Sequence, residues 1–169
     1  MQQKGQPHED ALPDWRGLLR DEYLLLQNTY EDSDRRAVTI KGWSATVAAV
    51  GLGAGFQYGR REFWMISVGT AVVFWVLEAI WKAFQYGHSR RIQQIESYFR
   101  GEGTSLFRLQ AYATWFEEYF SRSVPGQVWE NLWLVPVFLP HMIIVVSGIT
   151  LFIISLATRG AFPAAPKVP

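Results

Sequence analysis

Four ionisable side chains lie within or beside apolar segments and could carry chemistry. Glu78 sits in the run FWVLEAIWKAF, with Lys82 four residues later. Lys41 lies in a segment rich in small residues, and His141 lies inside a long apolar run. An ionisable side chain inside a membrane must be paired or must face water, so it is a candidate for an ion or proton path.

Other chemistry has little support in the sequence. The chain contains no cysteine, which excludes disulfides, cysteine-containing zinc sites and thiol catalysis. His8, His88 and His141 are scattered, with no metal-ligand spacing between them. The glycine-rich run at 51–55 lies inside an apolar segment instead of between a strand and a helix. We therefore expect no enzyme activity, no cofactor and no metal site.

Three apolar segments predict an all-α membrane protein with three transmembrane helices. Residues 132–157 form a run of 26 without Asp, Glu, Lys or Arg, longer than the roughly 20 residues needed to cross a bilayer. Residues 63–84 form a second span, and residues 37–58 form a weaker one with many small residues. Because only a short connection separates the latter two, residues 37–84 are expected to form a helical hairpin.

The distribution of basic residues predicts the orientation. Five Lys and Arg lie in residues 1–36 and six in residues 82–130, against four in the remaining segments outside the spans. The positive-inside rule then places the N-terminal region and the connection 85–131 in the cytoplasm and the tail 158–169 outside, in a bacterial inner membrane. Since residues 1–36 are polar and acidic, we expect no cleaved signal peptide.

Three helical patterns are expected in the cytoplasm. Residues 14–34 have an apolar stripe at steps of three and four, with Asp14 as N-cap, and nothing stops this helix before the first span. Residues 88–100 and 105–120 give two further patterns. We favour packing of 105–120 against 14–34 over a place in the membrane interface, and VPG at 124–126 predicts a turn.

Depth in the membrane predicts which ionisable groups meet. Glu78 lies about six residues, or roughly 9 Å, from the cytoplasmic end of its span, and Lys41 lies roughly 6 Å from the same side. Glu78 could therefore pair with Lys41 or with Lys82. His141 lies roughly 13 Å into the third span, and Glu78 is the nearest ionisable group in depth. The cluster is either a pin between helices or the lining of a water-filled path.

Small residues and prolines should shape the packing of the spans. Small side chains let transmembrane helices approach closely, either within the hairpin or between subunits. The candidates are Ala45, Ala49, Gly51, Gly53 and Gly55. Pro136 and Pro140 are expected to kink the third span.

Two stretches carry a resemblance to known proteins: YEDSDRRAVTIKGWSATVAAVGLGAGF (30–56) and VVFWVLEAIWKAFQ (72–85). They resemble small, uncharacterised bacterial inner-membrane proteins in which a cytoplasmic helix leads into a two-span hairpin. The arrangement is also similar to the SLATT group of predicted pore-forming effectors of bacterial defence systems. The likeness covers roughly residues 20–100 and is architectural, with no catalytic motif to transfer.

The function expected from these patterns is a homo-oligomeric channel or pore-forming effector in contact with membrane lipid. Three helices alone are too few to enclose a water-filled path, so a transport function implies several copies of the chain. The alternative is a non-catalytic scaffold or accessory subunit that binds a protein partner through its cytoplasmic helices. The net charge of +1 gives no electrostatic footprint for nucleic acid.

Overall fold

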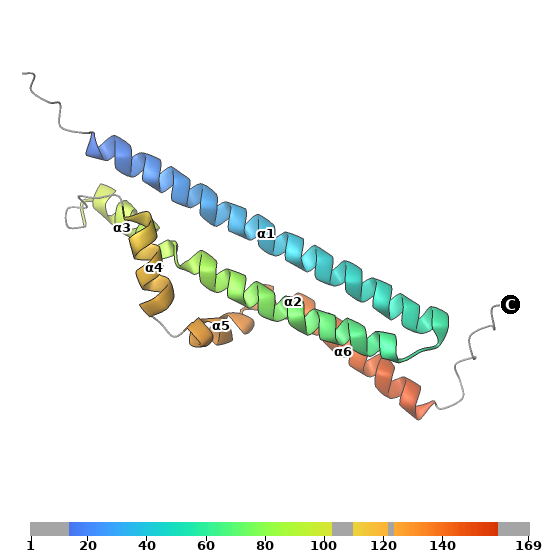
Figure 1. Ribbon diagram of the computed structural model, residues 1–169. Coiled ribbons are helices and arrows are strands. Elements are labelled where there is room, and N and C mark those ends of the chain that lie inside the picture. The colour runs from blue at the N-terminus through green and yellow to red at the C-terminus, as the bar shows by residue number, and fades with distance from the viewer. Residues whose placement is uncertain (1–13, 103–109, 122–123, 159–169) are drawn as a thin grey trace, which may run out of the picture.

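The computed structural model describes residues 14–102, 110–121 and 124–158, which form α-helices joined by short connections (Figure 1). About 90% of these residues are helical and none of them lies in a strand, which confirms the all-α prediction. The elements are α1 (Trp15–Tyr58), α2 (Glu62–Tyr86), α3 (Ser89–Phe99), α4 (Ala111–Ser121), α5 (Val124–Leu132) and α6 (Val135–Ala157).

The first helix is continuous from the polar N-terminal region to the end of the first span. α1 has 44 residues, which corresponds to about 66 Å. Asp14 is its N-cap, as expected, and its carboxylate accepts from the backbone N–H of Gly17 at 3.1 Å. Gly59 ends the helix with φ of 60°, a left-handed conformation that glycine adopts without a steric penalty. The hairpin turn that follows leads into α2.

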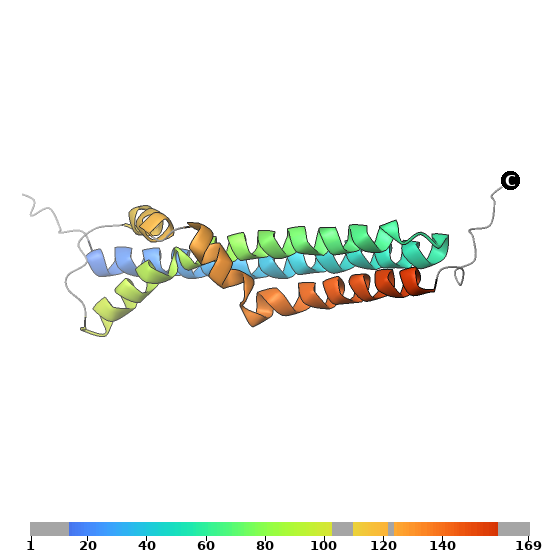
Figure 2. The ribbon, with the colours of Figure 1, turned by 90° about the horizontal axis from the view of Figure 1, so that it is seen from below.

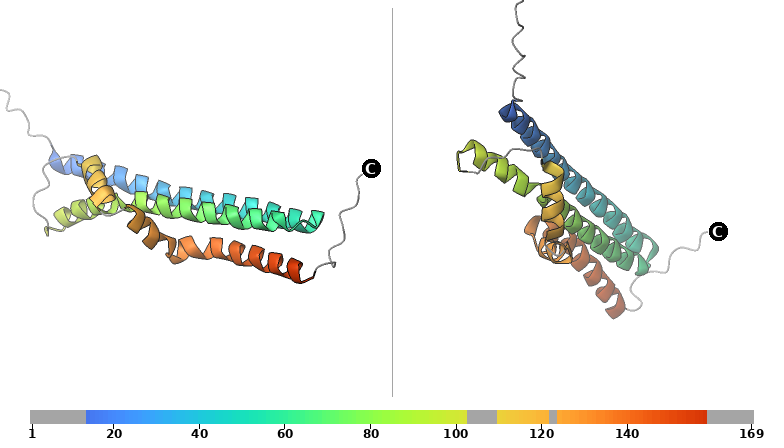
Figure 3. Two further views of the ribbon diagram at one scale, coloured as in Figure 1. Left: turned by 60° about the horizontal axis from the view of Figure 1, so that its bottom comes forward. Right: turned by 60° about the vertical axis from the view of Figure 1, so that its left-hand side comes forward.

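α2 lies between α1 and α6 and contacts both along much of its length (Figure 3). Glycines allow the close approach. A Cβ at Gly55 would clash with the indole of Trp64, and a Cβ at Gly148 would lie 2.6 Å from Val68 Cγ2. The packing of these three helices is therefore set by the absence of side chains at the crossing points.

Three helical segments are long and apolar enough to cross a membrane. They lie in α1, in α2 with its continuation into α3, and in α6. Their outward faces carry large apolar side chains that no part of the described chain covers. Val50, Val73 and Ile143 are 68%, 66% and 60% exposed. Exposed apolar surface of this extent suits a lipid environment and not water.

α3 and α4 lie at one end of the bundle, beside the start of α1, and α5 lies against α2 between α4 and the start of α6 (Figure 2). α3 packs on α1 through a small core of Leu19, Leu26, Ile92 and Ile95. The α1–α2 turn lies at the opposite end, as does the end of α6 (Figure 1). The polar N-terminal part of α1 and the connection between spans thus share one side of the molecule.

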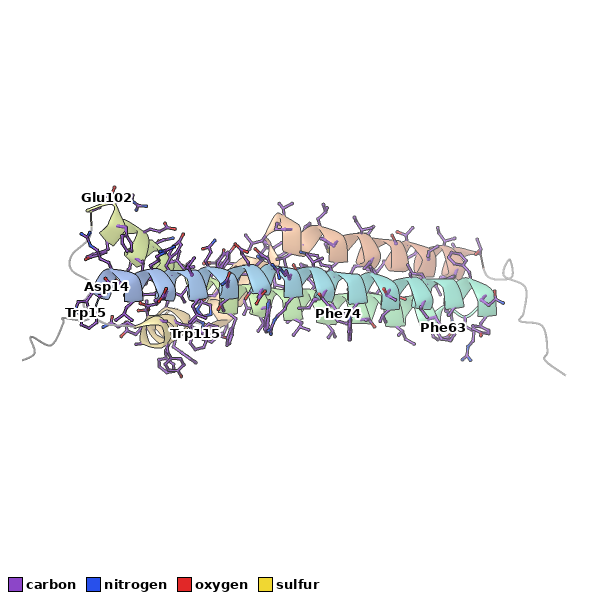
Figure 4. The ribbon with its side chains drawn as sticks, turned by 90° about the horizontal axis from the view of Figure 1, so that it is seen from above. Asp14, Trp15, Phe63, Phe74, Glu102 and Trp115 are labelled. Carbon is purple, nitrogen blue, oxygen red and sulfur yellow. The ribbon has the colours of Figure 1, made fainter. Side chains whose placement is uncertain are left out.

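The expected packing of residues 105–120 on 14–34 is largely wrong. Residues 103–109 lie outside the described residues, and α4 covers mainly the junction of α2 and α3. Trp115 and Tyr119 pack on Phe84, with ring centroids 4.7 and 5.1 Å away, and Trp115 marks this position at the bundle end in Figure 4. α3 covers this part of α1 instead. It follows α2 directly, and its apolar stripe of Ile92 and Ile95 packs on α1.

The start of the third span also differs from the prediction. The VPG segment at 124–126 begins α5 instead of forming a turn, and α6 begins at Val135, so residues 132–134 are not part of it. Pro136 therefore occupies the first turn of α6, where a helix has no partner for a backbone N–H and proline causes no kink. Pro140 lies inside the helix, as expected.

Candidate functional site

A hydrogen-bonded and ion-paired network of polar side chains connects all three spans at a similar depth along the bundle. Lys41 Nζ on α1 lies 2.8 Å from Glu78 Oε1 on α2. The other carboxylate oxygen, Oε2, lies 3.1 Å from Nε2 of His141 on α6. His141 Nδ1 in turn lies 3.1 Å from the hydroxyl of Ser44, back on α1. The sequence placed Glu78 nearest to His141 in depth and left its lysine partner open between Lys41 and Lys82, and it missed Ser44.

The network is buried inside a single copy of the chain. The side chains of Glu78 and His141 are fully inaccessible, and Lys41 is 26% exposed. Ser44 lies one turn after Lys41 on the same helix, at 1% exposure, so the two residues reach Glu78 and His141 from one face of α1. The carboxylate therefore has a charged partner on one side and an imidazole on the other.

The donor and acceptor roles follow from the chemistry of the groups. An ionised carboxylate only accepts hydrogen bonds, so Nε2 of His141 carries the proton and donates to Glu78. The other ring nitrogen, Nδ1, shares a hydrogen bond with the Ser44 hydroxyl, which can donate or accept. Lys41 approaches Glu78 Oε1 as an ion-pair partner without the alignment of a hydrogen bond.

Lys82 takes no part in this network. Its ammonium group lies 2.8 Å from Asp34 Oδ1 and 2.7 Å from Gln85 Oε1, and Gln85 donates to the carbonyl of Tyr30 at 3.0 Å. This bond from Lys82 lowers the pKa of the Asp34 carboxyl below its usual value. Of the two lysines that sequence left open as partners of Glu78, the fold selects Lys41 and uses Lys82 to fix α1 to the end of α2.

A second buried ion pair lies in the end layer and was missed from the sequence. Arg91 on α3 donates to both oxygens of Glu22 on α1, at 3.0 and 2.8 Å, and the backbone N–H of Gln110 donates to Glu22 at 3.2 Å. Arg91 is 0% and Glu22 6% exposed. A signal was present, because Glu22 falls on the helix face of Leu19 and Leu26, where a charged residue needs a buried partner.

The small residues of α1 divide between two opposite faces. Gly51 and Gly55 face α2, where an added Cβ would clash with Ser67 and Trp64 respectively. Ala45, Ala49 and Gly53 are exposed, and an added Cβ at Gly53 meets no atom within 4 Å. Close packing within the hairpin therefore explains Gly51 and Gly55 but not Ala45, Ala49 and Gly53.

The exposed face of α1 carries a continuous stripe without a large apolar side chain, which we term the outer stripe. Its members are Thr39, Gly42, Thr46, Ala49, Gly53 and Gln57, all exposed. At 3.6 residues per turn they fall within an arc of about 80°, opposite the buried Ser44, Ala48 and Gly55. The two threonines donate to carbonyls of the preceding turn, at 3.1 and 2.9 Å, which satisfies their hydroxyls without a partner helix.

Fold and site together define an integral membrane protein with a buried polar network between three spans. Among the described residues no group of three or more His, Asp or Glu is arranged to hold a metal ion. Comparison with protein-family models, with curated proteins and with solved structures gives no match.

Proposed function

We propose that the chain is a channel or pore-forming protein of the bacterial inner membrane that assembles from several copies through the outer stripe of α1. The observation that carries the proposal is the stripe itself. Glycine and small polar residues on a lipid-facing surface give little stabilisation to an isolated helix, whereas they allow another helix to approach closely. The proposal agrees with the resemblance to hairpin effectors described above.

A pore needs several copies because the polar network of each protomer lies between its own three helices and leaves no water-filled path there. Glu78 and His141 are fully buried between the three helices of one chain, so in this arrangement they hold the protomer together and do not line an axis between protomers. An axis lined by the outer stripe would present Thr39, Thr46 and Gln57 to it. These residues supply hydroxyl and amide groups, which tolerate water without introducing a fixed charge.

The proposed orientation has the N-terminal part of α1 and helices α3 to α5 in the cytoplasm. Basic residues are more frequent on that side, and the positive-inside bias acts on such loops and flanking segments. The extracytoplasmic side then holds the α1–α2 turn and the end of α6. A cysteine introduced at Gly59, in the α1–α2 turn, should therefore react with an impermeant maleimide added to intact cells. The labelling would be specific, because the chain has no other cysteine.

Native mass spectrometry from nanodiscs tests the assembly. The wild-type chain should give one defined oligomer, and Gly53→Leu should shift it to monomer because leucine fills the outer stripe. Gly69→Leu is the matched control, since Gly69 is an exposed glycine of α2 that also has no atom within 4 Å of an added Cβ. A monomeric wild type, or equal oligomers in both variants, would reject the stripe as the interface.

Planar-bilayer recording then tests the pore. Wild type and Gly69→Leu should conduct, and Gly53→Leu should not. An oligomer that gives no current would support the stripe as the interface and reject the proposed channel function.

One observation favours the alternative, a non-catalytic scaffold. α4 presents Tyr112, Phe116 and Phe120 outward, at 73%, 47% and 56% exposure, beside the Trp115 and Tyr119 rings that contact α2. Aromatic residues are enriched at protein interfaces. A partner that co-purifies in fixed stoichiometry and is lost in Phe116→Ser, together with absent conductance, would favour the scaffold over the channel.

A further inference from the structure

The ends of α1 and α3 that lie farthest from the spans border an open cleft of about 640 Å³. The two helices meet at the core around Leu26 and Ile95 and separate towards this end (Figure 2). Asp14 at the start of α1 and Glu102 just beyond α3 mark this end of the molecule in Figure 4. The volume lies within the usual range for small-molecule sites.

The walls of the cleft combine guanidinium groups with aromatic rings. Arg16, Arg20 and Tyr23 come from α1, and Phe99 and Arg100 come from the end of α3. Tyr23 donates its hydroxyl to Glu96 Oε1 at 3.1 Å, a bond between the two helices at the cleft. Phe99 is 53% exposed, which leaves its ring available to an apolar group.

The charge of the walls favours an anion. The lining holds three guanidinium groups against two carboxylates, Asp14 and Glu96. Glu96 accepts from Tyr23 and also lies 3.8 Å from Arg100. Arg100 lies 2.9 Å from Glu102. Within the described part of the chain, Arg16 and Arg20 have neither an ion pair nor a side-chain hydrogen bond, so two guanidinium groups of one helix remain to bind an anionic ligand.

We propose that this cleft binds a phosphorylated small molecule with an apolar or aromatic group. The phosphate would bind Arg16 and Arg20, which present planar donors suited to phosphate oxygens. The apolar part would pack on Phe99 and the ring of Tyr23. Such a ligand bridges α1 and α3 and does not depend on the proposed pore.

The ligand comes from the aqueous phase and not from the bilayer. Arg20 precedes the first span, which starts at residue 37, by a helical length of about 25 Å. This distance is larger than the thickness of the headgroup layer on one side of a bilayer. A lipid headgroup held in the membrane therefore does not reach the cleft when α1 stands along the membrane normal.

Isothermal titration calorimetry of the full chain in detergent tests the site, with 1-naphthyl phosphate as the probe and inorganic phosphate and 1-naphthol as comparators. The probe should bind more tightly than either comparator. Arg16→Gln/Arg20→Gln should weaken probe binding by at least about tenfold, and Phe99→Ala should weaken binding of the probe but not of inorganic phosphate. Arg35→Gln is the matched control, since Arg35 is an exposed arginine of α1 outside the cleft that pairs with Asp32.

The outcomes separate cleanly. Circular dichroism of each variant should show unchanged total helix content, as expected for substitution of exposed side chains. No binding of the probe, or equal loss in Arg35→Gln and in the double variant, overturns the site. Binding of inorganic phosphate as tight as that of the probe overturns the apolar half of the proposal. Stronger binding of anionic lipid vesicles than of the probe, with the same dependence on Arg16 and Arg20, overturns the aqueous source.

Discussion

Removing Lys41 should destabilise the protomer more than removing the carboxylate that it neutralises. Lys41→Met leaves an ionised Glu78 fully buried, with only the His141 bond to stabilise it. Breaking a buried ion pair from one side typically costs about 3–5 kcal/mol. Because the side chain of Lys41 is 26% exposed, solvent screens part of this interaction, and we expect about 2 kcal/mol.

Glu78→Gln should cost less. Glutamine keeps an acceptor for His141, and the lysine left behind has enough exposure to extend its ammonium group towards the interface. We expect a loss of about 1 kcal/mol. The double variant Lys41→Met/Glu78→Gln contains no unpaired charge, so it should be more stable than Lys41→Met alone by about 1 kcal/mol.

Unfolding by SDS from mild detergent micelles, followed by circular dichroism, measures these free energies. Arg60→Met supplies the control, because Arg60 and Glu62 form a surface pair in the same hairpin, at 68% and 62% exposure, and such pairs contribute about 0–1 kcal/mol. Additive effects of the two network substitutions would refute the coupling. So would a loss in Lys41→Met no larger than in Arg60→Met.

The same two single variants distinguish a purely structural role of the network from a role in lining a water-filled path. If Glu78→Gln and Lys41→Met lower stability and leave conductance per assembled channel unchanged, the network is purely structural. Altered conductance at normal assembly would instead show that ions or protons reach Glu78 while the channel conducts.

Three further predictions concern packing, pH and the end layer. Gly55→Ala should destabilise by about 1–3 kcal/mol through its clash with Trp64, whereas the exposed Gly53→Ala should be neutral or slightly stabilising, as SDS unfolding will show. The ring of His88 stacks on Trp115 of α4, with ring centroids 6.1 Å apart, and burial lowers the pKa of the His88 imidazole from its usual value. Docking of α4 should therefore weaken as the pH falls below about 6.5, the usual pKa of histidine. Hydrogen exchange of α4 should then be faster, after correction for intrinsic rates, at about pH 5.5 than at about pH 7.5, and His88→Gln should abolish the difference. Arg91→Met should expose α3 to protease by leaving Glu22 unpaired, and Arg91→Met/Glu22→Leu should restore resistance; no difference between the two would contradict a buried ion pair.

The spans and the first three members of the network could be predicted because both depend on one-dimensional quantities. Apolar length identifies a span, and counting residues from its end gives depth, which brought Lys41, Glu78 and His141 to similar levels. The continuous course of α1 followed from the lack of any breaking residue before Ala37. Depth does not give rotation about the helix axis. Ser44 was therefore missed, and the choice between Lys41 and Lys82 stayed open.

The end layer was harder to predict because its helices are short and each has more than one apolar neighbour. Periodicity shows that α4 has an apolar face, but it does not say which helix covers that face. The packing of Trp115 and Tyr119 on Phe84 decides this, and Trp115 reaches Phe84 over Gly87, where α2 ends. The approach is close, since a Cβ at Gly87 would lie 2.6 Å from Trp115. The short helix α5 likewise replaced a predicted turn, because proline in a first helical turn starts a helix as readily as it marks a loop.

The two small-residue faces of α1 have different physical consequences, and this difference supports assembly. The face with Gly55 is already packed against α2, so its glycines are explained by the fold of one chain. The outer stripe has no such explanation within one chain, and a span surrounded only by lipid would lose no packing if leucine or valine stood in it. Since the polar network already fixes the three helices of the protomer to one another, α1 can present the stripe on a rigid surface. A rigid helix face loses little conformational entropy on association, which is the property that a self-assembling channel requires.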